Sequence, residues 1–246
     1  MFPYRDDNPT LAVPITTLLL IGLNVAAWVL VQGMGAEPSL SASVCRLGLI
    51  PGDFLNRLPD GYQIPMGRGL ACVLDEAPTW HTPFTSMFLH GGWLHLIGNV
   101  WFLWVFGNNV EDSMGRFRFL FFYVLCGLAA AALQTVLDPS SAIPMVGASG
   151  AISGVMGAYV LLYPRVRVHM LVVLVVFITT IRVPAFVMLG YWFLLQLVGG
   201  AASVGQEGGG VAFWAHVGGF VAGAVLVNAF KDRALVARHR ALATTM

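Results

Sequence analysis

The chain has 246 residues, of which 57% are apolar and only 10% are charged. Soluble domains carry about 25% charged residues, so the composition excludes an ordinary soluble protein and predicts an integral membrane protein. The formal net charge is +1, and no basic cluster lies outside the C-terminal tail. This charge distribution also excludes a nucleic-acid-binding protein.

Six apolar segments are long enough to cross a bilayer. A helical span needs about 20 mostly apolar residues, and spanning backbone must satisfy its hydrogen bonds internally, which favours helices. In chain order the segments are 15–33, 93–110, 117–137, 147–163, 183–203 and 211–230. We therefore predict an all-α fold, a polytopic bundle of six transmembrane helices.

The positions of Lys and Arg predict the orientation of this bundle, because basic loops stay in the cytoplasm. Ten of the 13 basic residues lie before the first span, after the even-numbered spans or in the tail. Both termini should then be cytoplasmic, and the expected location is the plasma (inner) membrane of a bacterium. The predicted parts are a short cytoplasmic N-terminus, 1–14, a membrane domain, 15–230, with a long outer loop at about 34–92, and a basic cytoplasmic tail, 231–246.

The segment HMLVVLVVFITTI, 169–181, is also apolar, but it is short for a span and lies between Arg167 and Arg182. Pro184 marks a new helix start directly after it. A seventh span here would place the basic tail outside. We therefore predict an interfacial or re-entrant stretch on the cytoplasmic side.

With this orientation the second, fourth and sixth spans begin at the outer face, and each carries unusual polar residues in its first two turns. They are His95 and Asn99 in WLHLIGN, Ser149 in GASG and His216 in FWAHVGG. At 1.5 Å of rise per residue, all lie roughly 5–10 Å below the outer surface. A lone serine in a membrane helix most often bonds its own backbone or aids packing, but four polar residues at one depth favour a functional site.

These residue types suit acyl transfer. Ser149 can attack a carbonyl group when a positioned base, His216, takes its proton. Asn99, His95 and the backbone N–H of Ser149 can donate hydrogen bonds to the oxyanion that develops. The pattern therefore predicts a serine hydrolase site inside the membrane.

The neighbours of the predicted nucleophile refine this hypothesis. Gly147 and Gly150 flank it and let substrate backbone approach closely. Asp138 and Glu207, the nearest acids in sequence, lie in loops, so we predict a Ser–His dyad rather than a three-residue arrangement.

The motifs that carry these residues resemble those of the rhomboid intramembrane serine proteases. HGGWLHLIGN, the GASG box and AHVGGFVAG occur in that family's order and spacing, and the similarity runs over most of 80–230. The resemblance implies a six-helix bundle with Ser149 as nucleophile, His216 as base, and His95 and Asn99 at the oxyanion. It also implies cleavage of single-span membrane proteins near their outer end, with transmembrane substrates and the lipid bilayer as partners and with no metal or cofactor.

Two further positions relate to this resemblance. His90, five residues before His95, resembles a recurrent histidine with a structural role in the long first loop. Ser153 stands where the family often has an aromatic ring that packs against the catalytic histidine. We expect Ser153 either to accept a hydrogen bond from His216 or to leave room for a water.

Small residues on the fourth and sixth spans predict that these helices pack closely, because small side chains let two backbones approach. The residues are Gly150, Gly154 and Gly157 on one helix and Gly218, Gly219, Ala222 and Gly223 on the other. Such a contact would bring Ser149 to His216.

Three other interpretations stay open, and the sequence also leaves the number of subunits open. A rhomboid-like pseudoenzyme would bind membrane proteins without cutting them, although Ser149 and His216 are both present. A transporter could use the polar residues at this depth to line a substrate path, but the spans contain no Asp or Glu for coupling. A metal site would need His81, His90 and His95, which have no Cys, Asp or Glu at ligand spacing.

The loops add two pairs of alternatives. Cys45 and Cys72 either form a disulfide, if the first loop faces an oxidising compartment, or remain two buried thiols. The glycine-rich loop 201–211 is either an ordinary connector or part of a lateral gate that Trp192 and Phe193 close.

Overall fold

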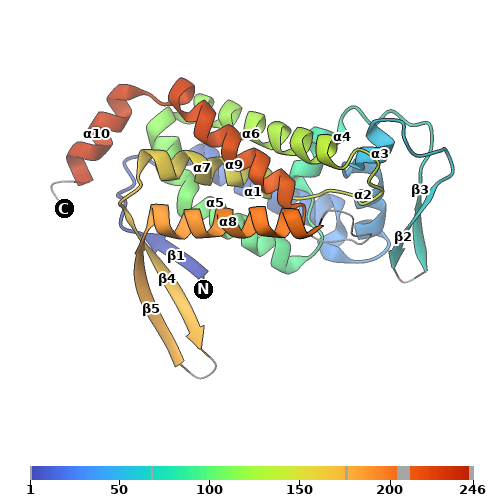
Figure 1. Cartoon of the computed structure of the whole chain (residues 1–246), viewed down its shortest axis with the longest axis horizontal. Helices are drawn as coiled ribbons and strands as arrows, with labels where there is room; N and C mark the ends of the chain where they lie inside the picture. The colour runs from blue at the N-terminus through green and yellow to red at the C-terminus, as the bar shows by residue number, and fades with distance from the viewer. Residues whose placement is uncertain (1, 68, 175–176, 204–210, 244–246) are drawn as a thin grey trace.

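A computed structural model describes residues 2–67, 69–174, 177–203 and 211–243 of the chain. Long helices run along its longest axis (Figure 1), and each follows one of the predicted spans to within a few residues. They are α1 (Ile15–Ala26, continued by a π-helical turn, Ala27–Val31), α5 (Trp93–Met114), α6 (Arg116–Leu137), α7 (Ser149–Leu162), α8 (Ala185–Ser203) and α9 (Phe213–Phe230).

The surface of this bundle suits lipid. Within the described part of the chain, α6, α8 and α9 are long and apolar enough to cross a membrane, while α1 with its π-helical turn and α7 are shorter apolar helices. Large apolar side chains point outward, among them Leu30, Phe117 and Val225, which are 82%, 80% and 69% exposed. In water such exposure would be costly, whereas lipid tails solvate it.

The centre of the bundle is α7, which packs against α5, α6 and α9. Its residues are nearly all buried, and Val155, Ala158 and Tyr159 have no exposed surface. Cys126 of α6 is buried against Gly154 of α7, where it acts as a small packing residue. A helix that is apolar all round belongs in the interior of a bundle.

The loop between α1 and α5 is folded rather than extended. It contains α2 (Ser39–Leu47), α3 (Pro51–Phe54), the hairpin β2 (Gln63–Gly67) with β3 (Leu70–Val73), and α4 (Thr82–Thr85). Ile50, Ile64 and Leu74 form a small core of their own. These elements gather at one end of the bundle, at the right of Figure 1.

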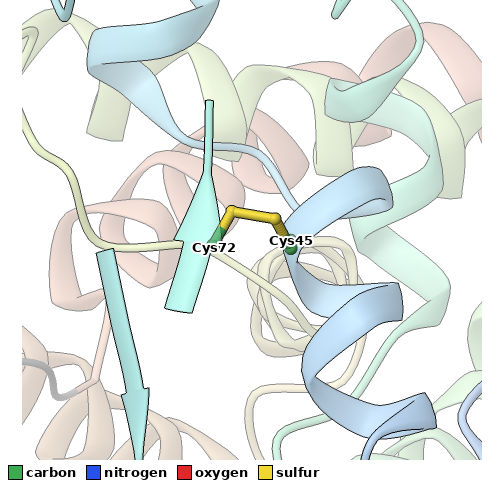
Figure 2. Close-up of a disulfide and its surroundings, with 2 residues drawn as sticks. All are labelled: Cys45 and Cys72. Carbon is green, nitrogen blue, oxygen red and sulfur yellow. A yellow bond between two sulfur atoms is a disulfide. The ribbon is translucent and has the colours of Figure 1, made fainter. Parts of the chain in front are cut away.

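The structure contains the disulfide between Cys45 and Cys72, one of the two alternatives for these cysteines. Figure 2 shows that it joins α2 to β3, and the two Cα atoms are 5.4 Å apart. The bridge ties the hairpin to the helix that follows α1.

The opposite end of the bundle carries a second sheet. β1 (Phe2–Asp6) pairs with β4 (Arg167–Leu174), which pairs with β5 (Phe177–Pro184), all antiparallel. The stretch 169–181 is therefore a hairpin rather than a span, and its Val, Ile and Thr residues favour strands because they are β-branched. The tail also folds into a helix, α10 (Arg233–Ala243).

The prediction of an all-α fold was thus too narrow, because the chain is mostly helical with two small sheets. Hydropathy detects helices that cross lipid, but it does not detect short strands in loops. The predicted gate loop, 201–211, lies mostly outside the described residues, since 204–210 are not described.

The segment before α1 and the first turn of α1 are held by the end of α5. The Glu111 carboxylate accepts hydrogen bonds from the backbone N–H groups of Thr16 and Thr17, at 2.9 and 2.8 Å. Asp112 accepts two more from Leu11 and Ala12. Carboxylates at a helix N-terminus satisfy unpaired donors and suit the helix dipole, so these two acids fix where α1 begins.

Candidate active site

The predicted nucleophile and base meet where two helices begin. Ser149 is the first residue of α7, and His216 lies in the first turn of α9. The Ser149 hydroxyl oxygen is 2.8 Å from His216 Nε2, a hydrogen-bond distance. Two residues that are 67 positions apart are thus in direct contact.

Glycines on α7 and α9 allow this contact. A Cβ atom added to Gly219 would overlap the Gly150 carbonyl, and one added to Gly223 would overlap that of Gly154. Gly157 meets the backbone of α9 in the same way, at Phe220. The predicted close packing of α7 on α9 is therefore present at Gly157, Gly219 and Gly223, where no larger side chain fits between the two backbones, whereas Gly218 faces Leu133 of α6.

The second ring nitrogen of His216 has a partner that the sequence did not indicate. His216 Nδ1 lies 2.8 Å from Gln196 Oε1, and the Gln196 side-chain amide donates to the Trp192 carbonyl at 3.2 Å. Gln196 stands on α8 and is buried. Its signal in the sequence is that it is the one amide in an apolar segment, where polar groups are costly.

The start of α9 is held by a second glutamine. Gln134 of α6 accepts a hydrogen bond from the backbone N–H of Ala215, at 3.2 Å. Ala215 directly precedes His216, and the first N–H groups of a helix lack partners within it. This contact fixes the backbone that carries the imidazole.

His95 and Asn99 lie on α5 and face the same cavity as Ser149. His95 Nδ1 accepts a hydrogen bond from the Gly91 backbone N–H at 3.2 Å, so a neutral His95 carries its proton on Nε2. A Cβ atom on Gly147 would lie 2.7 Å from that Nε2 and 3.6 Å from the Ser149 hydroxyl oxygen. Asn99 donates one amide proton to the His95 carbonyl at 2.9 Å, which leaves the other free.

Gly147 has a backbone φ of +126°, a conformation that side chains disfavour. Its missing side chain leaves space between the His95 ring and the Ser149 hydroxyl. Two physical reasons therefore favour glycine at position 147: its backbone dihedral angle and the close approach of the His95 ring.

A cavity of about 770 Å³ joins these residues. It is lined from α5, α6, α7, α8 and α9, and from the folded loop by Pro51 and Gly91. Among the described residues that line it, Asp138 is the one Asp, Glu, Lys or Arg. The cavity is large enough for water and for a segment of peptide chain.

Ser153 does not bond to His216, which was one of its two predicted roles. Its buried hydroxyl donates to the Ser149 carbonyl one turn earlier, at 2.6 Å. The aromatic ring near His216 comes instead from Trp192 of α8, with ring centroids 5.8 Å apart. Trp192 thus supplies the aromatic contact to the imidazole that Ser153 cannot make.

His90 is fully buried beside this site. Its backbone N–H and carbonyl both bond to the Gln32 side chain, each at 2.8 Å, and its ring packs edge-on against His95, with centroids 5.2 Å apart. Burial, with a smaller contribution from His95, lowers the pKa of His90 to about 3. The ring is therefore neutral at physiological pH and supports His95 by packing.

Within the described part of the chain, no three residues among His, Cys, Asp and Glu are grouped so that they could hold a metal ion. His81, His90 and His95 do not form such a group.

Comparison with known protein families finds a match over more than half of the chain. Residues 77–232 match the sequence model of the Rhomboid domain. The chain belongs to the rhomboid family. This membership and its apolar helices make it a polytopic integral membrane protein.

Named rhomboids from several organisms resemble the chain. It is 32% identical to Rhomboid protease GluP of Bacillus subtilis over 162 residues, which are 64% of this chain and 29% of that protein. It is 30% identical to Rhomboid protein 1, mitochondrial, of Saccharomyces cerevisiae over 144 residues, 56% of this chain and 38% of that protein. Rhomboid-like protein 11, chloroplastic, of Arabidopsis thaliana is 37% identical over 84 residues, 34% of this chain and 30% of the relative. The matches thus span about a third of each relative.

Proposed function

We propose that this rhomboid is an intramembrane serine endopeptidase, with Ser149 as nucleophile and His216 as general base. The observation that carries the proposal is the 2.8 Å contact between the Ser149 hydroxyl and His216 Nε2, placed in a cavity inside an apolar bundle. A serine and a histidine at this distance are what nucleophilic catalysis requires.

In the proposed reaction, the Ser149 oxygen attacks the carbonyl carbon of the scissile peptide bond while His216 Nε2 takes the hydroxyl proton. The tetrahedral intermediate collapses, the C–N bond breaks, and His216 gives the proton to the leaving amine. Water then attacks the acyl-enzyme carbonyl carbon while His216 Nε2 takes a proton from it. The C–O bond to Ser149 breaks, and His216 returns the proton to the Ser149 oxygen. A neutral imidazole that accepts through Nε2 suits both steps.

The oxyanion would be held by donors on two helices. The Ser149 backbone N–H begins α7 and has no carbonyl one turn earlier to bond. His95 carries its donor on Nε2, and Asn99 retains a free amide proton. His95 Nε2 borders the space beside Gly147, and Asn99 and Ser149 line the same cavity as His95. Preorganised donors of this kind would stabilise developing negative charge strongly.

The topology that we propose follows from the positions of the basic residues. We propose six spans in the membrane domain, 15–230, with both termini cytoplasmic, in the plasma membrane of a bacterium. The basic residues near α10, β1 and β4 lie at the opposite end of the bundle from the folded loop (Figure 1). Because basic segments favour the cytoplasm, the site and its cavity would then lie toward the outer face.

The substrate class that fits is a single-span membrane protein whose helix is loosened near the outer face. A peptide bond in an intact helix is hidden by its own hydrogen bonds, whereas a locally extended segment can enter a cavity of about 770 Å³. Small residues in the substrate would help its backbone approach Gly147 and Ser149.

Purified protein in liposomes, incubated with a single-span test substrate, tests the proposal. The parent should cleave it and should be labelled on Ser149 by a fluorophosphonate, while Ser149→Ala should do neither. Ser43→Ala is a matched control, because that hydroxyl bonds only to its own helix, at the Leu40 carbonyl. Substrate binding without cleavage or labelling in the parent would instead indicate a non-proteolytic rhomboid.

A further inference from the structure

We infer that Gln196 is a positioning residue that holds His216 in the one tautomer able to accept the Ser149 proton. The consequence for rate rests on the proposed protease function, whereas the tautomer itself does not. The inference begins from two distances, 2.8 Å from Gln196 Oε1 to His216 Nδ1 and 2.8 Å from His216 Nε2 to the Ser149 hydroxyl.

The polarity of this chain of hydrogen bonds is determined at its far end. The Trp192 carbonyl oxygen can only accept, so the Gln196 NH₂ group must face it, at 3.2 Å. The Gln196 oxygen is then the atom that faces His216, and an amide oxygen also can only accept. His216 Nδ1 must therefore carry the ring proton.

A neutral imidazole has one protonated nitrogen and one acceptor nitrogen. With its proton on Nδ1, His216 presents the Nε2 lone pair to the Ser149 hydroxyl, which must donate. In the other tautomer, Nε2–H would point at Ser149 and could not take its proton. One amide thus decides whether the pair of residues can react.

No other described contact of the His216 side chain makes this choice. Trp192 packs on the ring with centroids 5.8 Å apart, which restricts its tilt but not its tautomer. The Ser153 hydroxyl is occupied by the Ser149 carbonyl at 2.6 Å. Gln196 therefore fills the role that a carboxylate has in a Ser–His–Asp triad.

An amide has a physical advantage over a carboxylate at this place. Gln196 is 8% exposed on an apolar helix, where a buried charge is costly. The amide supplies the directional acceptor without that charge, and its two polar ends are both bonded, as a buried polar group requires.

The tautomer can be measured directly by NMR of protein labelled with ¹⁵N and ¹³C in histidine, with His216→Ala used to assign the resonance. The parent should show His216 protonated on Nδ1. Gln196→Leu, which removes the acceptor, should shift the population toward Nε2–H, whereas Gln196→Glu, which keeps an oxygen, should retain Nδ1–H. A parental tautomer in Gln196→Leu would overturn the inference.

The kinetic test uses the same variants. Gln196→Leu should lower kcat and the rate of fluorophosphonate labelling by about tenfold, the value of one hydrogen bond, with KM nearly unchanged. Gln196→Glu should recover most of the rate. Asn24→Leu is the control, because the buried Asn24 amide bonds to the Leu20 carbonyl of its own helix, α1, at 2.7 Å, and Asn24 is not among the described residues that line the cavity. This variant should leave kcat unchanged.

The outcomes separate the two proposals. If the parent cleaves no substrate, the proposed function fails, but the NMR result still decides the role of Gln196. If Gln196→Leu loses activity only in proportion to a fall in unfolding temperature and keeps its tautomer, Gln196 is merely structural and the inference is wrong.

Discussion

Replacing Gly219 with alanine is expected to separate the Ser149 hydroxyl from His216. The added Cβ atom would lie 2.9 Å from the Gly150 carbonyl carbon and closer still to its oxygen, whereas ordinary contacts begin at 3.4 Å. The obstacle is helix backbone, which cannot rotate away as a flexible side chain can. Because the oxygen must also reach an ordinary contact distance, the two helices must move apart at this point by about 1 Å or more.

The magnitude follows from the position of the site one turn away. His216 Nε2 is 2.8 Å from the Ser149 oxygen, and such bonds weaken beyond about 3.2 Å. A misplacement of about 1 Å can cost on the order of 10²-fold in rate, so Gly219→Ala should lower kcat by about that factor. Overpacking should also lower the free energy of unfolding by about 1–3 kcal/mol.

Cleavage of the single-span substrate and fluorophosphonate labelling, both far below the unfolding temperature, measure the effect on the site. Gly190→Ala is the matched control, because a Cβ atom on that α8 glycine would meet nothing within 4 Å. Gly190→Ala should keep parental rates. If Gly219→Ala also cleaves and reacts at parental rates, close packing of α7 on α9 does not set the distance between Ser149 and His216.

Two other predictions concern the ends of the bundle. Cys45→Ser opens a bridge between residues 27 positions apart, which should lower the free energy of unfolding by about 3–4 kcal/mol; an unchanged unfolding temperature would contradict this. Burial raises the pKa of Asp6 from 3.8 to about 6, so its contribution to stability is complete below pH 3.8 and is lost as pH rises through 6. At pH 7, Asp6→Asn should therefore raise the free energy of the opening that exposes the β1 amides to hydrogen exchange by on the order of 3 kcal/mol relative to the parent. At pH 3.5 the two proteins should be protected equally. An equal difference at both pH values, after correction for intrinsic exchange rates, would refute this reasoning.

The sequence by itself determined which segments are long apolar helices and where polar residues lie along them. A spanning helix must be apolar over its length and must satisfy its own backbone, so α6, α8 and α9 could be read locally. The glycines of α7 and α9 were also readable, because small residues at regular spacing indicate close packing. The matched depth of Ser149 and His216 on two spans of the same direction was likewise enough to predict that they form one site.

Only the tertiary structure decided what surrounds the imidazole. Gln196 reaches His216 across 20 positions of sequence, and Trp192 packs against the imidazole, although the family's aromatic position carries Ser153 in this chain. Neither contact has a local signature, since each depends on how α8 is rotated against α9. The pairing of β1 with β4, across more than 160 residues, was hidden for the same reason. Periodicity records which face of an element is apolar, whereas the partner of a polar atom is set by the relative placement of elements far apart in the chain.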